Sequence, residues 1–194
     1  MGALVVYARG ERYNFPFLHD RTVDKGANAI ATLLYCTVRH FKTVGTSRSV
    51  ETLYLQCDGG SENINRTIYG LCDMFIRMGW FKDIYLNRLP VGHSHSLIDQ
   101  YFSVLHPRLY STNSRDLPEF VSSLIGEKCA NIAIKPNILW LQNAFDFREL
   151  FKDVTRIYGM RKRIYGWYFT CGGVVGDNIP RSHVDLWYVN GLIT

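Results

Sequence analysis

The stretch that decides the fold is Leu53-Tyr-Leu-Gln-Cys-Asp58-Gly-Gly-Ser-Glu-Asn-Ile-Asn65, followed by Leu89-Pro-Val-Gly-His-Ser-His-Ser-Leu-Ile-Asp99-Gln-Tyr-Phe102. In the first segment an apolar strand ends at Asp58, and a glycine-rich turn leads into a helix. In the second, a histidine-containing loop leads into a helix that carries Asp99. Polar sites of α/β sheets gather at the carboxyl ends of strands. The two carboxylates are therefore candidate ligands of a shared divalent metal ion.

Apolar strands and amphipathic helices alternate through the first two thirds of the chain. Hydrophobic periodicity predicts strands over residues 3–9, 12–18, 51–57 and 83–89, and helices over 26–41, 61–78 and 97–105. Pro16 predicts an edge or bulged position in the second strand, and Gly79 ends the helix that begins near Ser61. This order indicates an α/β sheet with helices packed on its faces.

The composition changes near Gly126. Short helices are predicted over 116–125 and 145–158, and strands over 163–171 and 183–189 with glycine- and proline-rich turns between them. We therefore expect a core over residues 1–126 and a small α+β extension over 127–194.

The overall composition indicates which broad classes of protein fit this chain. No apolar run approaches the roughly 18 residues of a membrane span, and no secretory signal begins the chain, so we expect a nuclear or cytoplasmic protein that is not secreted. The five cysteines are scattered, without a Cys-x-x-Cys pair, which favours buried thiols over disulfides or a zinc ribbon. A formal net charge of +5 favours a nucleic-acid partner, and Arg161-Lys162-Arg163 is the densest basic run.

The residues near the two carboxylates admit more than one interpretation. Asp58 is either a metal ligand or the capping residue of a tight Asp-Gly-Gly turn. Asn63 adds a polar group to the predicted first helical turn, while Asn65 is expected to be an exposed helical residue. His95 and Asp99 are four residues apart on one helix face, so His95 could bind metal, shuttle a proton or contact phosphate. Alternatively, His93 and His95 bond to backbone near the start of the helix.

Several familiar motifs are absent or incomplete. The chain has no Gly-x-Gly-x-x-Gly after a strand, no Walker-type Gly-Lys-Ser and no Gly-x-Ser-x-Gly elbow. The His93-Ser-His95 pair fits the start of the metallohydrolase pattern His-x-His-x-Asp-His, but Leu97 and Ile98 stand where the Asp and the last His should be. A mononuclear site of His93, His95 and Asp58 or Asp99 remains an alternative. The tryptophans of the tail could stack on bases, although packing into a small core is their commoner use.

Asp58-Gly-Gly-Ser-Glu-Asn resembles the motif at the second catalytic Asp of integrases and related transposases. The fuller pattern, Asp-(Asn/Gly)-x-x-x-Asn-x-Asn followed by Gly-His-(Thr/Ser)-His-x-x-x-Asp, is similar to a eukaryotic transposase-derived family with a ribonuclease H-like core. The resemblance covers about residues 2–105. It implies that Asp58 and Asp99 are the second and third metal-binding carboxylates, and that Mg²⁺ or Mn²⁺ is the cofactor.

The resemblance also implies a function, and a catalytic residue that this sequence lacks. The function is metal-dependent cleavage and strand transfer of DNA, with DNA as partner. Asn63, His93 and, from its charge, the basic run 161–163 are our candidate DNA contacts, and a homo-oligomer is compatible with this function. In such cores the first catalytic Asp lies on a strand before the one that here starts at Gly2, so we expect this chain to be incomplete or inactive, as in a degenerate or domesticated mobile element. The alternative is a non-catalytic module that binds nucleic acid or protein.

Overall fold

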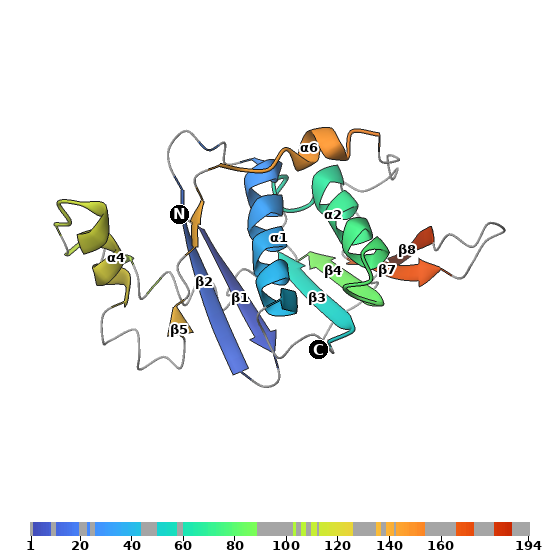
Figure 1. Ribbon diagram of the computed structural model, residues 1–194, viewed down its shortest axis with the longest axis horizontal. Coiled ribbons are helices and arrows are strands. Elements are labelled where there is room, and N and C mark those ends of the chain that lie inside the picture. The colour runs from blue at the N-terminus through green and yellow to red at the C-terminus, as the bar shows by residue number, and fades with distance from the viewer. Residues whose placement is uncertain are drawn as a thin grey trace. The chain divides into compact units, whose positions relative to one another are not determined.

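The computed structural model describes two compact units of an α/β protein (Figure 1). The first unit comprises Met1–Val23 and His93–Asn143, and the second Asp24–Gly92 and Ala144–Thr194. The residues described are 2–8, 11–19, 23, 26–43, 50–57, 60–88, 103, 106–107, 110–111, 113–125, 135–136, 139–141, 143–153, 166–172 and 181–187. The α/β class predicted from the alternating pattern is confirmed.

The first unit is built on an antiparallel hairpin of β1 (Gly2–Ala8) and β2 (Glu11–His19). On its other side β2 pairs in parallel with two short strands, β5 (Lys135–Pro136) and β6 (Leu139–Leu141). β2 therefore has neighbours on both sides, but at Pro16 it pairs with β1 alone, so the expected edge position holds at that residue. Pro16 falls between the residues of β2 that pair with β5 and those that pair with β6, where its missing N–H interrupts no described ladder bond. The predicted helix over 116–125 is confirmed as α4 (Leu117–Ile125).

The second unit holds a four-stranded sheet of order β3-β4-β7-β8. The parallel pair is β3 (Thr52–Cys57) and β4 (Asp83–Arg88); β7 (Gly166–Gly172) and β8 (Arg181–Trp187) continue the sheet in antiparallel fashion. The division into these two units thus differs from the predicted division at a boundary near Gly126. Strands from the tail pair with β4, so they complete the core sheet of this unit instead of forming a separate extension.

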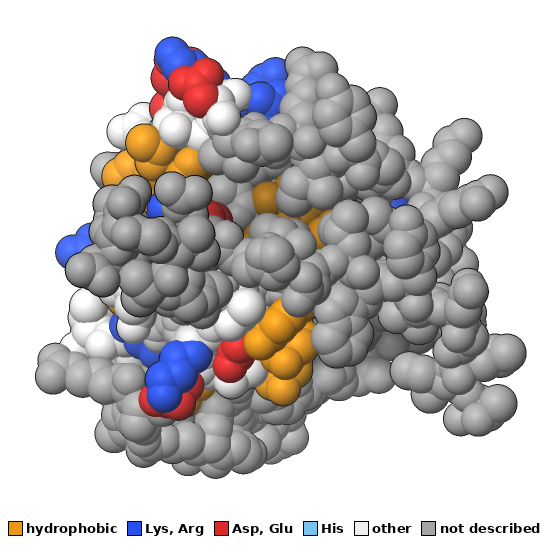
Figure 2. Space-filling model, turned by 90° about the vertical axis from the view of Figure 1, so that its right-hand side faces the viewer, with side chains coloured by type: hydrophobic (Ala, Val, Ile, Leu, Met, Phe, Trp, Pro, Cys, Tyr) orange, Lys and Arg blue, Asp and Glu red, His pale blue; other side chains and the backbone are white. Residues whose placement is uncertain are grey.

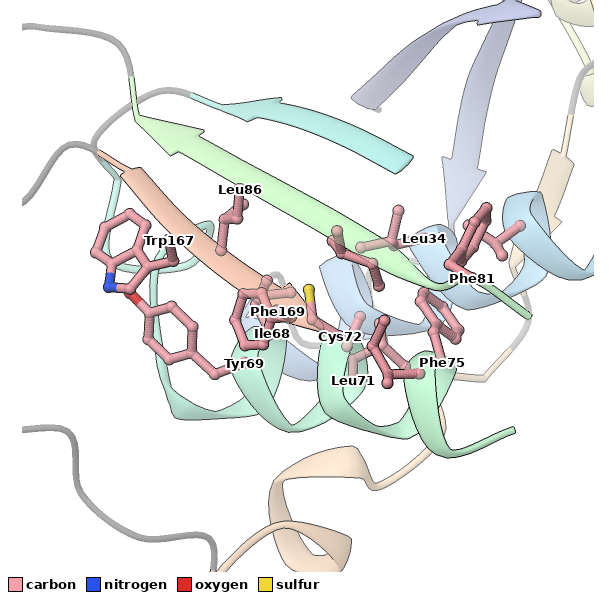
Figure 3. Close-up of a cluster of buried hydrophobic side chains, with 14 of the residues drawn as sticks. Leu34, Ile68, Tyr69, Leu71, Cys72, Phe75, Phe81, Leu86, Trp167 and Phe169 are labelled. Carbon is pink, nitrogen blue, oxygen red and sulfur yellow. The ribbon is translucent and has the colours of Figure 1, made fainter. Parts of the chain in front are cut away.

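Helix α2 (Arg66–Arg77) packs against this sheet with α1 (Ala27–Thr43) beside it, and the short α6 (Phe147–Leu150) packs against both helices (Figure 1). Alternate residues of β4 and β7, such as Leu86 and Trp167, face the helices and are buried with the apolar faces of α1 and α2 (Figure 3). The predicted stripe of α2 is confirmed at Ile68, Leu71, Cys72 and Phe75. A helix was predicted over 145–158. Residues 145–153 of this range are described, and among them only α6 is an α-helix.

Helix α2 begins five residues later than the predicted start at Ser61. Asn65 is its N-cap: the side-chain oxygen accepts from the N–H groups of Thr67 and Ile68 at 2.9 and 3.1 Å. Its amide nitrogen donates to the carbonyls of Ser61 and Glu62 at 3.0 and 2.7 Å. The expectation of an exposed helical Asn65 is therefore wrong. The end of the helix is as predicted, since Gly79 takes a φ of +67°.

Candidate functional site

The candidate site starts at the carboxyl ends of two parallel strands. β3 ends at Cys57 and β4 at Arg88, and these two residues are partners in the register. Asp58 follows Cys57 directly in the chain and, with Gly59, lies outside the described residues. The parallel strand pair thus provides the edge at which α/β sheets collect their ligands.

The turn that leads from β3 to α2 is well defined from Gly60 onward. The carbonyl of Gly60 accepts from the N–H groups of Asn63 and Ile64, both at 3.1 Å. Asn63 is half-buried in this turn, so its expected place in a first helical turn is wrong. Together with the Asn65 cap, these bonds fix the chain two residues after Asp58. Asn65, the second Asn of the Asn-x-Asn motif, therefore has a structural role as the N-cap of α2.

The other predicted site residues fall where the structure makes no statement. Asp99, His93, His95 and the run Arg161-Lys162-Arg163 all lie outside the described residues. Within the described ranges, no group of three or more His, Cys, Asp and Glu side chains is arranged to hold a metal ion. The metal site therefore remains a prediction from sequence.

Two buried polar atoms lie beneath the strand ends, and sequence reasoning missed them as a pair. Tyr69 of α2 and Trp167 of β7 have ring centroids 5.3 Å apart, and their side chains are only 3% and 1% exposed. Neither Tyr69 Oη nor Trp167 Nε1 has a hydrogen-bond partner among the described residues. Figure 3 shows the two rings next to each other at one end of the core cluster.

The electrostatics of this corner follow from burial. Burial raises the pKa of the Tyr69 phenol far above its ordinary value, the thiols of Cys57 and Cys72 raise it further, and the Arg88 guanidinium lowers it. Burial likewise raises the pKa of Cys72. Both groups stay neutral at physiological pH.

The opposite face of the same sheet carries a row of tyrosines. Tyr54, Tyr85 and Tyr168 are register partners on β3, β4 and β7, and their rings stack with centroids 4.9 and 4.7 Å apart. Tyr168 donates a hydrogen bond of 2.5 Å to Asp83, and this bond raises the pKa of the Tyr168 phenol. Tyr54, at the end of the row, is 72% exposed. Figure 2 shows one face of the molecule on which hydrophobic side chains reach the surface beside charged ones.

A polar hollow at the start of α4 is explained by helix capping. It is lined by Asn113, Ser114, Arg115, Asp116 and Glu119. Asp116 accepts from the N–H of Glu119 at 2.8 Å, and the Glu119 carboxylate accepts from the N–H of Arg115 at 2.7 Å. This reciprocal pair satisfies the N–H of Glu119 in the first turn of α4 and the N–H of Arg115 just before the helix.

Comparison with known proteins identifies a family. A family model described as a domain of unknown function, DUF7869, matches residues 1–171. The chain belongs to the DUF7869 family. The DUF7869 match includes both stretches that resemble transposases and extends to β7. No curated protein and no solved structure matches the chain. Among the described helices, none is long and apolar enough to cross a membrane.

Proposed function

We propose that this DUF7869 chain is a transposase- or integrase-like core for divalent-metal-dependent cleavage and strand transfer of DNA. The observation that carries the proposal is the placement of the motif: Asp58 directly follows a strand that pairs in parallel with β4, and α2 connects the two strands. An antiparallel hairpin and a helix precede them, in the order that the resemblance implies.

The outer edge of β3 also supports this proposal. Within the described part of the chain, β3 pairs with β4 alone. Its six residues, Thr-Leu-Tyr-Leu-Gln-Cys, include no charge and no proline, the devices by which proteins usually protect an edge strand. An open, uncharged edge of this kind can accept a further strand.

The donor chemistry fits Mg²⁺ or Mn²⁺, which prefer carboxylate oxygens to thiolates or imidazoles. Asp58 and Asp99 would hold the ions. When bound, two such ions activate water or a 3′-hydroxyl and stabilise the leaving oxygen. Asn63, His93 and the basic run 161–163 would contact the DNA backbone.

Titration calorimetry with Mn²⁺ tests the metal site. We expect binding by the wild type that Asp58→Ala and Asp99→Ala each remove. The control is Asp73→Asn, a carboxylate on α2 paired with Arg77 at 2.6 Å, which should leave binding unchanged. Binding that survives Asp58→Ala would contradict the proposal. Stoichiometric zinc after purification would instead favour the mononuclear site of His93, His95 and Asp58 or Asp99.

The net charge of +5 favours a second candidate, a module that binds nucleic acid without catalysis. This candidate predicts DNA binding that weakens steeply with salt and survives Asp58→Ala and Asp99→Ala. Replacing residues 161–163 by alanine should weaken binding at every DNA sequence alike. Binding that is indifferent to salt would exclude it.

A further inference from the structure

We propose that the free edge of β3 binds β3 of a second copy of this chain, in antiparallel orientation, with Tyr54 on the twofold axis. The sheet of each copy, β3-β4-β7-β8, would then continue through the interface as one sheet. This interaction surface goes beyond the proposed function, because it requires neither metal nor DNA.

The backbone of β3 directs hydrogen-bonding groups at its free edge. The carbonyl of Glu51, just before β3, accepts from the N–H of Asp83 on β4 at 3.3 Å. Successive residues of a strand direct their N–H and C=O groups to opposite sides. The odd-numbered residues of β3 therefore bond to β4, whereas Thr52, Tyr54 and Gln56 direct their groups away from it. Within the described part of the chain, no strand pairs with that side.

The apolar side chains of β3 also lack cover at this edge. Leu53 and Leu55 face the helices and pack against the core, yet both are only half-buried. Their register partners on β4, Ile84 and Leu86, are 0% and 2% exposed. The difference is that β4 has a neighbour on each side, whereas β3 has one among the described strands. A further strand here would remove apolar surface of both leucines from water, which favours binding.

On the opposite face, the tyrosine row ends at the same edge. Tyr54 stacks on Tyr85, and the Tyr54 side chain is 72% exposed. A strand that paired with β3 would place the residue opposite Tyr54 about 5 Å away. The rings within the row are 4.9 and 4.7 Å apart, so an aromatic residue at that position would continue the stack.

A second copy of β3 fits these features together. With the twofold axis at Tyr54, this residue meets the same residue of the other copy, and stacked tyrosine pairs already form twice within the row. Thr52 falls opposite Gln56, so the outward-directed backbone groups of the strand all find partners. On the face toward the helices, Leu53 falls opposite Leu55, and apolar surface meets apolar surface.

The charges of this region permit the symmetric pairing. β3 contains no charged residue, so no like charges meet between the paired strands. Glu51, which precedes the strand, falls opposite Cys57, and its carboxylate forms an ion pair with Lys82 at 2.8 Å. Twofold dimers are the commonest oligomers of soluble proteins. A single strand pair is a small interface, so we expect a dissociation constant in the micromolar range.

Sedimentation velocity over a concentration series tests the interface. We expect the wild type to form dimers, and Tyr54→Lys and Tyr54→Glu each to remain monomeric, because like charges then meet on the axis. An equimolar mixture of these two variants should dimerise again, since opposite charges meet there. Tyr110→Lys changes a tyrosine that is 90% exposed and lies outside the interface, so this control should leave association unchanged.

A second variant tests the backbone contacts. Thr52→Pro removes an N–H that is directed at the free edge, and proline is tolerated at the first residue of a strand. It should weaken the dimer while the circular dichroism spectrum stays that of the wild type. Unchanged spectra of the Tyr54 variants would likewise show that the monomer keeps its fold.

Three results would overturn the inference. One is a wild type that stays monomeric at sub-millimolar concentration, as it would if another strand of the same chain occupied the edge. Another is a dimer that survives both substitutions of Tyr54. The third is a mixture of the lysine and glutamate variants that does not associate, because the axis then lies elsewhere. Mn²⁺ binding has no part in these measurements, so the proposed function is tested separately.

Discussion

The ring of Phe151 lies directly over the Cα of Gly70, so closely that a Cβ at Gly70 would overlap three ring carbons. This contact joins the segment after α6 to the middle of α2, and both residues are buried in the main core. The glycine is present for close packing, since the middle of a helix otherwise disfavours it.

Gly70→Ala should therefore destabilise the protein, even though alanine is the better helix former by about 1 kcal/mol. Overpacking costs about 1–3 kcal/mol, so we expect a net loss of roughly 1 kcal/mol in urea unfolding. In a Phe151→Ala background the same change should be neutral or stabilising. A stabilising Gly70→Ala in the wild type would contradict the contact.

Asn65→Ala should lower the free energy of unfolding by about 1–2 kcal/mol, because the cap of α2 and the bonds to the preceding turn are both lost. Asn65→Asp keeps the acceptor for Thr67 and Ile68 but loses the two donated bonds. It should fall between the wild type and the alanine variant. An aspartate variant as weak as alanine would refute the capping role.

Stability should fall at alkaline pH. Folding raises the pKa values of Tyr69 and Cys72 above their ordinary 10.0 and 9.0, because burial disfavours their charged forms. The unfolded chain releases these protons first, so their contribution is complete below about pH 9 and declines above it. Each group then costs about 1.4 kcal/mol per pH unit. Cys72→Ala should flatten the decline measured by urea unfolding between pH 8 and 10.5, and an unchanged slope would contradict this assignment.

Among the three stacked tyrosines, substitution of the central one should destabilise the protein most. Tyr85 stacks on both Tyr54 and Tyr168, whereas Tyr54 has one stacking partner among the described aromatic residues. Cross-strand pairs contribute roughly 0.2–1 kcal/mol each. In chemical denaturation, Tyr85→Ala should therefore cost more than Tyr54→Ala. The reverse order would show that stacking does not stabilise this face.

The sequence predicted the local parts of this fold well and the long-range parts poorly. The stripe of α2 and the stop at Gly79 depend on neighbouring residues, and both are confirmed. The predicted start of α2 was wrong because Ser61 and Asn65 are both good N-cap residues, and the folded chain uses Asn65. The pairing of β7 with β4 joins residues about eighty positions apart, and β5 and β6 are too short to show a period.

In the candidate site too, the local features could be predicted and the long-range contacts could not. The motif around Asp58 was readable because its residues are close in sequence. Tyr69 and Trp167 were not predicted to meet, because one looked like a helix residue and the other like core filling. Only the register of β7 brings them to the same end of the sheet.

Anomalous diffraction from a crystal soaked in Mn²⁺ tests the central claim most directly, because it locates the ion and its ligands together. The account predicts a manganese peak in contact with the carboxylates of Asp58 and Asp99. No peak at either residue, with the two carboxylates more than about 8 Å apart, would contradict it.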